Sequence, residues 1–207
     1  MRIKSIKSKI IFVSVLLLVV PSLIVGLMSY KSASQGLDTA GKVTIQNAVT
    51  MAMQTIDALN NEVEAGNLSL EEAQEQVKVY LLGELDEEGK RPINSDINLG
   101  KHGYFVVYDA EGNEVAHPTI EGQNVWETQD KSGQYLVQEQ IKAAQNGGGF
   151  TTYLWNFPNE PDRIGEKIMY NDLDPNWGWI VTAGSYLEDF NESSSQILWT
   201  FLITLAI

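Results

Sequence analysis

Near its N-terminus the chain runs from Ile10 to Met28 without a charged residue. A helix of about 20 apolar residues crosses the roughly 30 Å hydrocarbon core of a bilayer, and Pro21 and Gly26 do not prevent this. The flank before the segment contains four basic residues and no acidic one: Arg2, Lys4, Lys7 and Lys9. The positive-inside rule therefore predicts a cytoplasmic N-terminus at residues 1–9 and a transmembrane helix at residues 10–29 that exports the residues after it.

A cleaved signal peptide is the alternative, because it also begins with basic residues and an apolar stretch. The apolar segment is long for a signal peptide. The following Ser29-Tyr30-Lys31 lacks the small residues of a cleavage site. We therefore expect the segment to be retained as an anchor.

A second apolar segment begins near Ile197 and extends to Ile207. It covers about half of a membrane crossing. A buried terminal helix is one interpretation. We expect instead that residues 191–207 are the start of a second transmembrane helix in a truncated chain, which would lead to a cytoplasmic signalling domain outside this sequence.

The segment between the two apolar regions is strongly acidic and contains no cysteine. All 27 Asp and Glu residues lie between Lys31 and Gln196. Such a surface keeps an exported domain soluble and argues against nucleic acid as a partner. The absence of cysteine excludes disulfides, thiol catalysis and cysteine-bound metal sites.

Helical periodicity dominates the first part of this segment. Six apolar residues spaced by three or four predict a helix over residues 42–64 that continues from the anchor: Ile45, Val49, Ala52, Ile56, Leu59 and Val63. This stripe either forms a homodimer contact or packs on the domain's own sheet. A capping box at Ser69 and Glu72 opens a second helix that reaches Leu81, and residues 134–145 form a third.

Residues rich in β-branched and aromatic side chains then predict five short strands. They are Tyr104–Tyr108, Val115–Ala116, Phe150–Trp155, Lys167–Asn171 and Trp179–Ser185. Short strands after long helices favour an α+β fold with an antiparallel five-stranded sheet.

Several short motifs, taken in order, resemble a single Cache domain of the sCache_2 type. They are Gly103-Tyr104-Phe105-Val106-Val107-Tyr108-Asp109, His117-Pro118, Gly122-Gln123-Asn124-Val125-Trp126, Gly147-Gly148-Gly149-Phe150, Tyr153-Leu154-Trp155, Lys167 with Tyr170, Trp177-Gly178-Trp179 and Gly184-Ser185-Tyr186. Cache domains of this type are the extracellular sensors of many bacterial chemoreceptors and some sensor kinases. The resemblance implies that residues 30–190 form an extracellular or periplasmic sensor, with a long N-terminal helix and a PAS-like sheet that carries a small-molecule pocket.

The resemblance also implies a ligand class, the small carboxylates such as acetate, propionate, pyruvate and lactate. Few cations are available to bind an anion in so acidic a domain. Lys167 lies in a predicted strand, where partial shelter from water strengthens its attraction to a carboxylate. A lysine on the solvent face of the sheet is the alternative. Arg91 offers a bidentate contact, but its loop position is equally consistent with a surface role.

Aromatic residues and one histidine complete the predicted ligand site. His117 is either a turn residue satisfied by the backbone or a hydrogen-bond donor to the ligand. Because side chains alternate along a strand, Tyr153 and Trp155 lie on one sheet face. Tyr104, Val106 and Tyr108 likewise share one face of their strand. Their default role is core packing, although a tyrosine hydroxyl or an indole N–H can also point into a cleft. Two further candidates are Trp126 and Tyr170.

Enzymatic function is not expected. The chain has two histidines and neither a Gly-x-Ser-x-Gly nor a His-Glu-x-x-His pattern. We expect no catalytic residue, metal or cofactor. The leading hypothesis is a homodimeric cell-membrane receptor that binds a small organic acid and displaces a membrane helix. The alternatives are a membrane-tethered scaffold without a small ligand and the sensor part of a histidine kinase.

Overall fold

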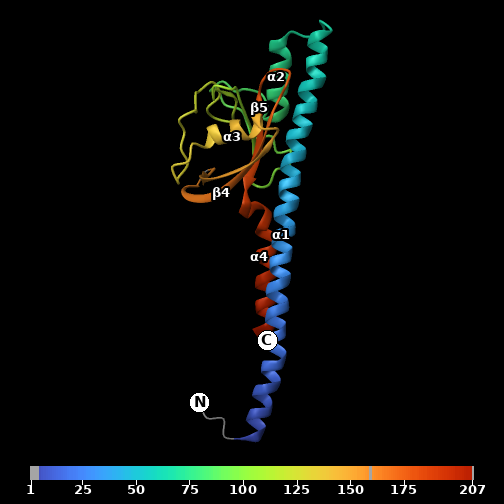
Figure 1. Cartoon of the computed structure of the whole chain (residues 1–207), viewed down its shortest axis with the longest axis vertical. Helices are drawn as coiled ribbons and strands as arrows, with labels where there is room; N and C mark the ends of the chain where they lie inside the picture. The colour runs from blue at the N-terminus through green and yellow to red at the C-terminus, as the bar shows by residue number, and fades with distance from the viewer. Residues whose placement is uncertain (1–4, 159, 207) are drawn as a thin grey trace. The chain divides into compact units, whose positions relative to one another are not determined.

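The computed structural model describes residues 5–158 and 160–206. Within these residues the elements follow the order drawn in Figure 1: α1 (Ile6–Glu64), α2 (Leu70–Leu81), β1 (Tyr104–Tyr108), β2 (Glu114–Ala116), α3 (Leu136–Gln145), β3 (Gly149–Phe157), β4 (Glu160–Leu173), β5 (Ile180–Tyr186) and α4 (Leu187–Ala206). The chain divides into two compact units, one of Met1–Thr39 with Phe190–Ile207 and the other of Ala40–Asp189.

The first unit pairs the N-terminal part of α1 with α4. The hydroxyl of Ser34 donates a hydrogen bond of 2.7 Å to Asn191, whose amide donates to Asp38. Gly26 allows a close approach, because a Cβ there would lie 2.3 Å from the ring of Phe201. Among the described residues, α1 alone is long and apolar enough to cross a membrane. The second span, at residues 191–207, stays a prediction.

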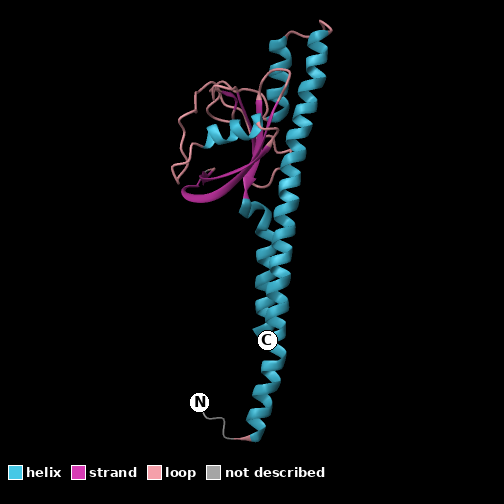
Figure 2. Ribbon diagram, viewed as in Figure 1, coloured by secondary structure: helices cyan, strands magenta, loops and turns pink. Residues whose placement is uncertain are grey.

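The second unit is built on a five-stranded antiparallel sheet with the strand order β2-β1-β5-β4-β3 (Figure 2). This confirms the predicted α+β fold. The hairpin of β3 and β4 is longer than predicted. The added part of β4 contains the exposed polar residues Glu160, Asp162, Arg163 and Glu166, which give no alternating hydrophobic strand signal. The pairing nevertheless extends there, because Trp155 pairs with Gly165 and Asn156 with Ile164.

Helices cover both faces of this sheet within residues 40–189. The predicted stripe of α1 packs inside its own unit, because Ile45, Val49, Ala52 and Ile56 are all 0% exposed. These side chains are therefore not available for a homodimer contact. The alternative interpretation of the stripe, packing within the domain, is the one observed.

The other face of the sheet is covered by α3. Its buried residues Val137, Ile141 and Ala144 join a hydrophobic cluster with Val106 of β1 and Met169 of β4. Because side chains alternate along a strand, residues of odd number on β4 face α3 and residues of even number face α1.

Local signals predicted the helix boundaries well. The hydroxyl of Ser69 accepts a hydrogen bond from the backbone N–H of Glu72, whose carboxylate accepts one from the N–H of Ser69. The two groups thus satisfy donors that the first turn of α2 leaves free.

Near the last strand, the indole N–H of Trp177 donates to Asn60 of α1 over 3.0 Å. Trp177 thereby joins the segment before β5 to α1, which is a structural role.

Candidate functional site

Lys167 lies on β4, between β5 and the edge strand β3, on the face of the sheet covered by α3. In the strand register it stands opposite Tyr153 of β3 and Tyr186 of β5. The residue is only 1% exposed. Its ammonium nitrogen lies 3.6 Å from the centroid of the Tyr104 ring and 5.8 Å from that of Tyr186. The alternative of a solvent-facing lysine is therefore wrong.

The Lys167 ammonium makes no ion pair and no hydrogen bond with the residues that the structure describes. Buried cations in proteins are nearly always paired, because removal from water costs several kcal/mol. The faces of Tyr104 and Tyr186 compensate part of this cost, since a desolvated cation–π contact contributes about 2 kcal/mol. The ammonium can still donate hydrogen bonds and its charge is not neutralised by a carboxylate, so it is suited to bind an anion.

His117 lies beside the same ring. Its imidazole makes an edge contact with Tyr104 at 5.9 Å between centroids. The Nδ1 atom accepts hydrogen bonds from the backbone N–H groups of Thr119 and Ile120, at 3.0 and 3.3 Å. Burial, and next the Lys167 ammonium, lower the pKa of His117 to about 4. The ring is therefore neutral at pH 7 and carries its proton on Nε2, which is free to donate. The interpretation of His117 as a turn residue satisfied by the backbone is confirmed for Nδ1, whereas a hydrogen bond from Nε2 to a ligand stays a prediction.

Glu114 is the acidic member of this region. It is 4% exposed, stands opposite Tyr108 in the strand register, and its Oε2 has no hydrogen-bond partner among the described residues. Burial raises the pKa of Glu114 to about 9, against the attraction of the Lys167 ammonium. Its carboxyl group is consequently protonated at pH 7 and leaves the positive charge of Lys167 unneutralised.

The other predicted aromatic residues divide into two groups. Tyr153 and Trp155 pack edge to face, 6.2 Å apart between ring centroids, on the α3 side with Lys167. Trp126 is partly buried against the same cluster, to which Tyr104 also belongs. These four aromatic residues thus surround the α3 face of the sheet.

Tyr170 does not join them. It lies three residues from Lys167 on β4 and therefore faces α1, where its hydroxyl accepts a hydrogen bond of 3.3 Å from Gln46. Its ring packs against Phe150 at 4.9 Å between centroids. The alternation along the strand, applied from Lys167, is enough to separate the two residues from the sequence alone.

Arg91 is buried but fully engaged by the protein. Its guanidinium makes a bidentate contact with Glu75 of α2, through two hydrogen bonds of 2.9 Å. It also donates to Glu121 at 2.6 and 3.2 Å, and its backbone N–H donates to the carbonyl of Pro118. Arg91 thereby holds the segment that carries His117, and it is not available to a ligand.

Three residues of this region were not predicted from the sequence: Glu114, Gln140 and Tyr186. Gln140 lies on the buried face of α3 and is 0% exposed. Its spacing from Val137 and Ala144 places it in an apolar stripe, a signal that was available. Glu114 alternates with the buried Ala116 on β2, which offered a weaker signal because β2 is so short.

A second charged cluster joins the end of the sheet to the first turn of α4. The Asp189 carboxylate accepts hydrogen bonds from the hydroxyl of Ser185 and from the backbone N–H of His102 at 3.0 Å. It lies 2.8 Å from Nδ1 of His102. The imidazole in turn makes edge contacts with the rings of Phe157 and Tyr186. Because Tyr186 also faces Lys167, this cluster connects the candidate site with α4.

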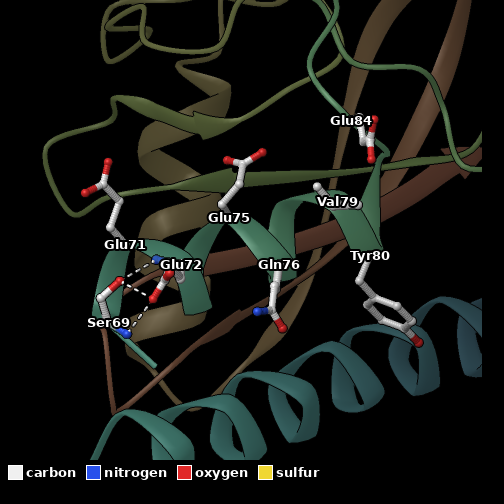
Figure 3. Close-up of a pocket in the computed structure, with 8 residues that line it drawn as sticks. All are labelled: Ser69, Glu71, Glu72, Glu75, Gln76, Val79, Tyr80 and Glu84. Carbon is white, nitrogen blue, oxygen red and sulfur yellow. Dashed lines mark hydrogen bonds between the residues drawn. The ribbon is translucent and has the colours of Figure 1, made fainter. Parts of the chain in front are cut away.

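A large open hollow lies elsewhere, along α2 (Figure 3). It has a volume of about 880 Å³, and Figure 3 shows four glutamates along its wall: Glu71, Glu72, Glu75 and Glu84. None of the predicted site residues lines it. A wall of carboxylates repels an organic anion, and the described residues contain no group of three side chains suited to hold a metal ion. The region around Lys167 is therefore the better candidate for an anion.

Comparison with known proteins gives a family match over most of the chain. Residues 37–200 match the model of the family described as Single Cache domain 2. This range contains the sheet, α2, α3 and the candidate site.

Two curated relatives are signalling proteins. Sensor histidine kinase MctS of Rhizobium johnstonii is 34% identical over 52% of this chain and 24% of its own length. Methyl-accepting chemotaxis protein McpP of Pseudomonas putida is 26% identical over 87% of this chain and 30% of its own length. The chain thus spans less than a third of either relative.

Two solved structures share the fold. One, a Cache chemosensory domain described for its carboxylic acid recognition, superposes with a TM-score of 0.59 at 23% identity, over 73% of this chain and 97% of that one. The other, a periplasmic sensor domain of a chemotaxis protein, gives a TM-score of 0.56 at 26% identity, over 68% and 91%.

Proposed function

Because the chain belongs to the Single Cache domain 2 family, we propose that it is the sensor part of a transmembrane receptor and binds a short-chain carboxylate beside Lys167. The observation that carries the proposal is the buried ammonium of Lys167, which no carboxylate of the described chain neutralises. A ligand carboxylate supplies the missing negative charge.

The surrounding groups favour a monoanion. Lys167 supplies one positive charge, His117 is neutral, and Arg91 is already bound to Glu75 and Glu121. A second carboxylate on the ligand would lie buried without a cation, which is strongly unfavourable. The Nε2–H of His117 adds a hydrogen bond to the anion. The rings of Tyr104, Tyr153 and Trp155 accommodate a short apolar tail.

Ligand entry requires the cover over the site to open, because Lys167 is 1% exposed. The segment between β2 and α3, which contains His117 and Trp126, provides this cover. When this segment closes again over the bound ligand, it moves closer to the sheet face that contains Lys167. Closure of this kind is a common way to convert binding into a conformational signal.

The signal leaves the domain through β5. Tyr186 ends β5 beside Lys167, and α4 begins at the next residue, Leu187. Asp189 fastens the first turn of α4 to Ser185 and His102. A change at the Lys167 site therefore acts on α4 directly, and helix shifts of about 1–2 Å are sufficient in other signalling proteins.

The cellular setting belongs to the same proposal. Residues 10–29 anchor the chain, residues 30–190 lie outside the cell membrane, and residues 191–207 begin a return to the cytoplasm. The relatives MctS and McpP are a histidine kinase and a chemotaxis protein, and both are much longer than this chain. A cytoplasmic output domain of either kind is consistent with this arrangement.

Calorimetric titration of the chain, solubilised in detergent and exhaustively dialysed, tests the proposal. We expect saturable one-site binding of propionate, pyruvate or lactate. Lys167→Met keeps the length of the side chain but removes its charge, so it should weaken binding roughly 100-fold or more, consistent with loss of a buried charged contact. Lys142→Ala is the matched control, because the Lys142 side chain is 70% exposed on α3.

Two results decide the matter. Unchanged affinity in the Lys167→Met variant would remove Lys167 from the site. An absence of heat and of thermal stabilisation with every two- to four-carbon carboxylate would favour the scaffold alternative. Melting curves control for folding, and the methionine variant should melt no lower than the wild type because it removes an unpaired buried charge.

A further inference from the structure

Two buried polar side chains near Lys167 have hydrogen-bonding capacity that the protein does not use. Glu114 on β2 is 4% exposed and Gln140 on α3 is 0% exposed. The Oε2 atom of Glu114 has no hydrogen-bond partner among the described residues, and neither Nε2 nor Oε1 of Gln140 has one of good geometry. A buried polar group of this kind that lacks a partner destabilises the folded protein, because the group has lost its hydrogen bonds to water.

Both side chains face the layer that contains Lys167. Glu114 lies close enough to the Lys167 ammonium for this cation to oppose the rise in the pKa of its carboxyl group. Gln140 lies beside the hydroxyl of Tyr153, and Tyr153 stands opposite Lys167 in the strand register. Tyr153 also interacts with Glu114. Lys167, Glu114 and Gln140 are therefore grouped around Tyr153, although they come from β4, β2 and α3.

Packing does not require a polar group at position 140. The neighbours of Gln140 on the buried face of α3 are Val137, Ile141 and Ala144. A leucine at position 140 would continue this apolar stripe and would leave no amide unsatisfied. Polar groups retained in a core without partners are typical of binding sites, where the ligand completes the hydrogen bonds.

The chemistry of the two groups identifies what they bind. A protonated carboxyl and a primary amide each contain a donor and an acceptor. They match an oxygen substituent, either a hydroxyl that donates and accepts or a carbonyl that accepts. A methyl or methylene group in the same place would leave all their polar atoms unpaired.

We propose that Glu114 and Gln140 form a second polar subsite that binds the oxygen on the ligand carbon next to the carboxylate, so that the sensor selects 2-hydroxy or 2-oxo monocarboxylates over unsubstituted acids of the same length. This inference rests on the proposed function of Lys167. Sites built to bind a ligand hydroxyl discriminate strongly against the analogue that lacks it, because their own polar groups are then left unpaired.

The experiment compares three acids of three carbons, namely lactate, pyruvate and propionate, by calorimetry on the detergent-solubilised chain. The wild type should bind lactate or pyruvate at least tenfold more tightly than propionate, which corresponds to one restored hydrogen bond. Glu114→Leu and Gln140→Leu should each reduce this ratio to within about threefold of unity while propionate affinity stays nearly unchanged. Glu114→Gln, which keeps a donor and an acceptor, should retain most of the preference.

The outcomes separate the two proposals. If propionate binds as tightly as lactate and pyruvate, or if both leucine variants keep the preference, the second subsite is wrong while Lys167 stands. If none of the three acids binds to the wild type, the proposed function itself fails and the subsite fails with it. Tighter binding of lactate would show that the subsite prefers a hydroxyl, and tighter binding of pyruvate would show that it prefers a carbonyl. Melting curves confirm that each variant is folded, and propionate binding provides an internal control.

Discussion

The ammonium nitrogen of Lys167 lies 3.6 Å from the centroid of the Tyr104 ring, although β4 and β1 are separated in the sheet by β5. The residue of β5 that pairs with Tyr104 is Gly184, and Gly184 also pairs with Met169 of β4. Because Gly184 has no side chain, the lysine and the tyrosine can meet across it.

Replacement of Tyr104 should show how much the ring stabilises the buried ammonium. Tyr104→Phe keeps the aromatic face, so we expect a stability near that of the wild type. Tyr104→Leu removes it and should lower the free energy of unfolding by about 2 kcal/mol, the value of a desolvated cation–π contact. Urea denaturation of both variants measures the difference. Equal stability of the two variants would show that the contact contributes nothing.

Gly184 should not tolerate even a methyl group. A Cβ at this position would lie 2.0 Å from the backbone carbonyl oxygen of Ile168 and 2.3 Å from the sulfur of Met169. The backbone atom cannot move aside without disrupting the pairing of β4 and β5. We expect Gly184→Ala to lower the free energy of unfolding by about 1–3 kcal/mol, as overpacking of a core typically does. Gly122→Ala is not a suitable control because its φ is +83°, whereas Gly36→Ala is, since no atom lies within 4 Å of its Cβ position.

Arg91 should be more important for stability than the other arginine of the sheet domain. Arg91→Ala removes hydrogen bonds to Glu75, Glu121 and the carbonyl of Gly83, and we expect a loss of about 2–3 kcal/mol because charge-assisted bonds contribute about 1.5–3 kcal/mol each. The ion pair between Lys78 and Glu121 remains in this variant and limits the loss of stability. Arg163→Ala breaks exposed ion pairs and a cation–π contact with the ring of Phe157, and it should change stability less than Arg91→Ala does. Chemical denaturation of the two variants, compared side by side, checks this order.

The pH dependence of stability should report the protonation of Glu114. Burial raises the pKa of Glu114 from 4.5 to about 9, so the folded state binds more protons than the unfolded state between these values, and stability falls as pH rises. Burial lowers the pKa of His117 from 6.5 to about 4, so its contribution is present above pH 6.5 and is lost as pH falls towards 4. The two slopes oppose each other below pH 6.5, and the Glu114 slope alone remains from pH 6.5 to 9.

In that upper window each pH unit should reduce stability by up to about 1.4 kcal/mol, the value for one proton. The charged groups that act on Glu114 are Lys167 of β4 and Glu121 of the following loop. Glu114→Gln cannot ionise, and it should flatten the profile between pH 6.5 and 9. Denaturation series at several pH values measure the slope. A slope that persists unchanged in this variant would assign the proton to another group.

The order of helices and strands could be predicted from the sequence because its signals are local. The capping box at Ser69 begins α2, and the aromatic and β-branched residues from Tyr104 to Tyr108 define β1 with the predicted bounds. Lys167 was chosen as a candidate because a lysine inside a predicted strand is conspicuous in a domain with few cations, and the family resemblance favoured a pocket over the solvent face.

The residues that make up the candidate site were harder to predict from the sequence. Tyr170 was a candidate because it belongs with Lys167 to the motifs that resemble the family, but strand alternation places the two on opposite faces. Glu114 and Gln140 were not identified because their importance lies in what they lack, a partner, and this depends on every neighbour from three other elements.

The sequence by itself determined the apolar segment near the N-terminus, the acidic character of the domain between the apolar segments, the α+β order of its elements and the family to which it belongs. All of these depend on residue type and spacing along the chain. Only the tertiary structure decided that the α1 stripe packs inside the domain, that Arg91 is bound by Glu75 and Glu121, and that Lys167 is buried without a carboxylate. The reason is that burial and charge pairing are set by side chains distant in sequence, which only the folded sheet and its covering helices bring together.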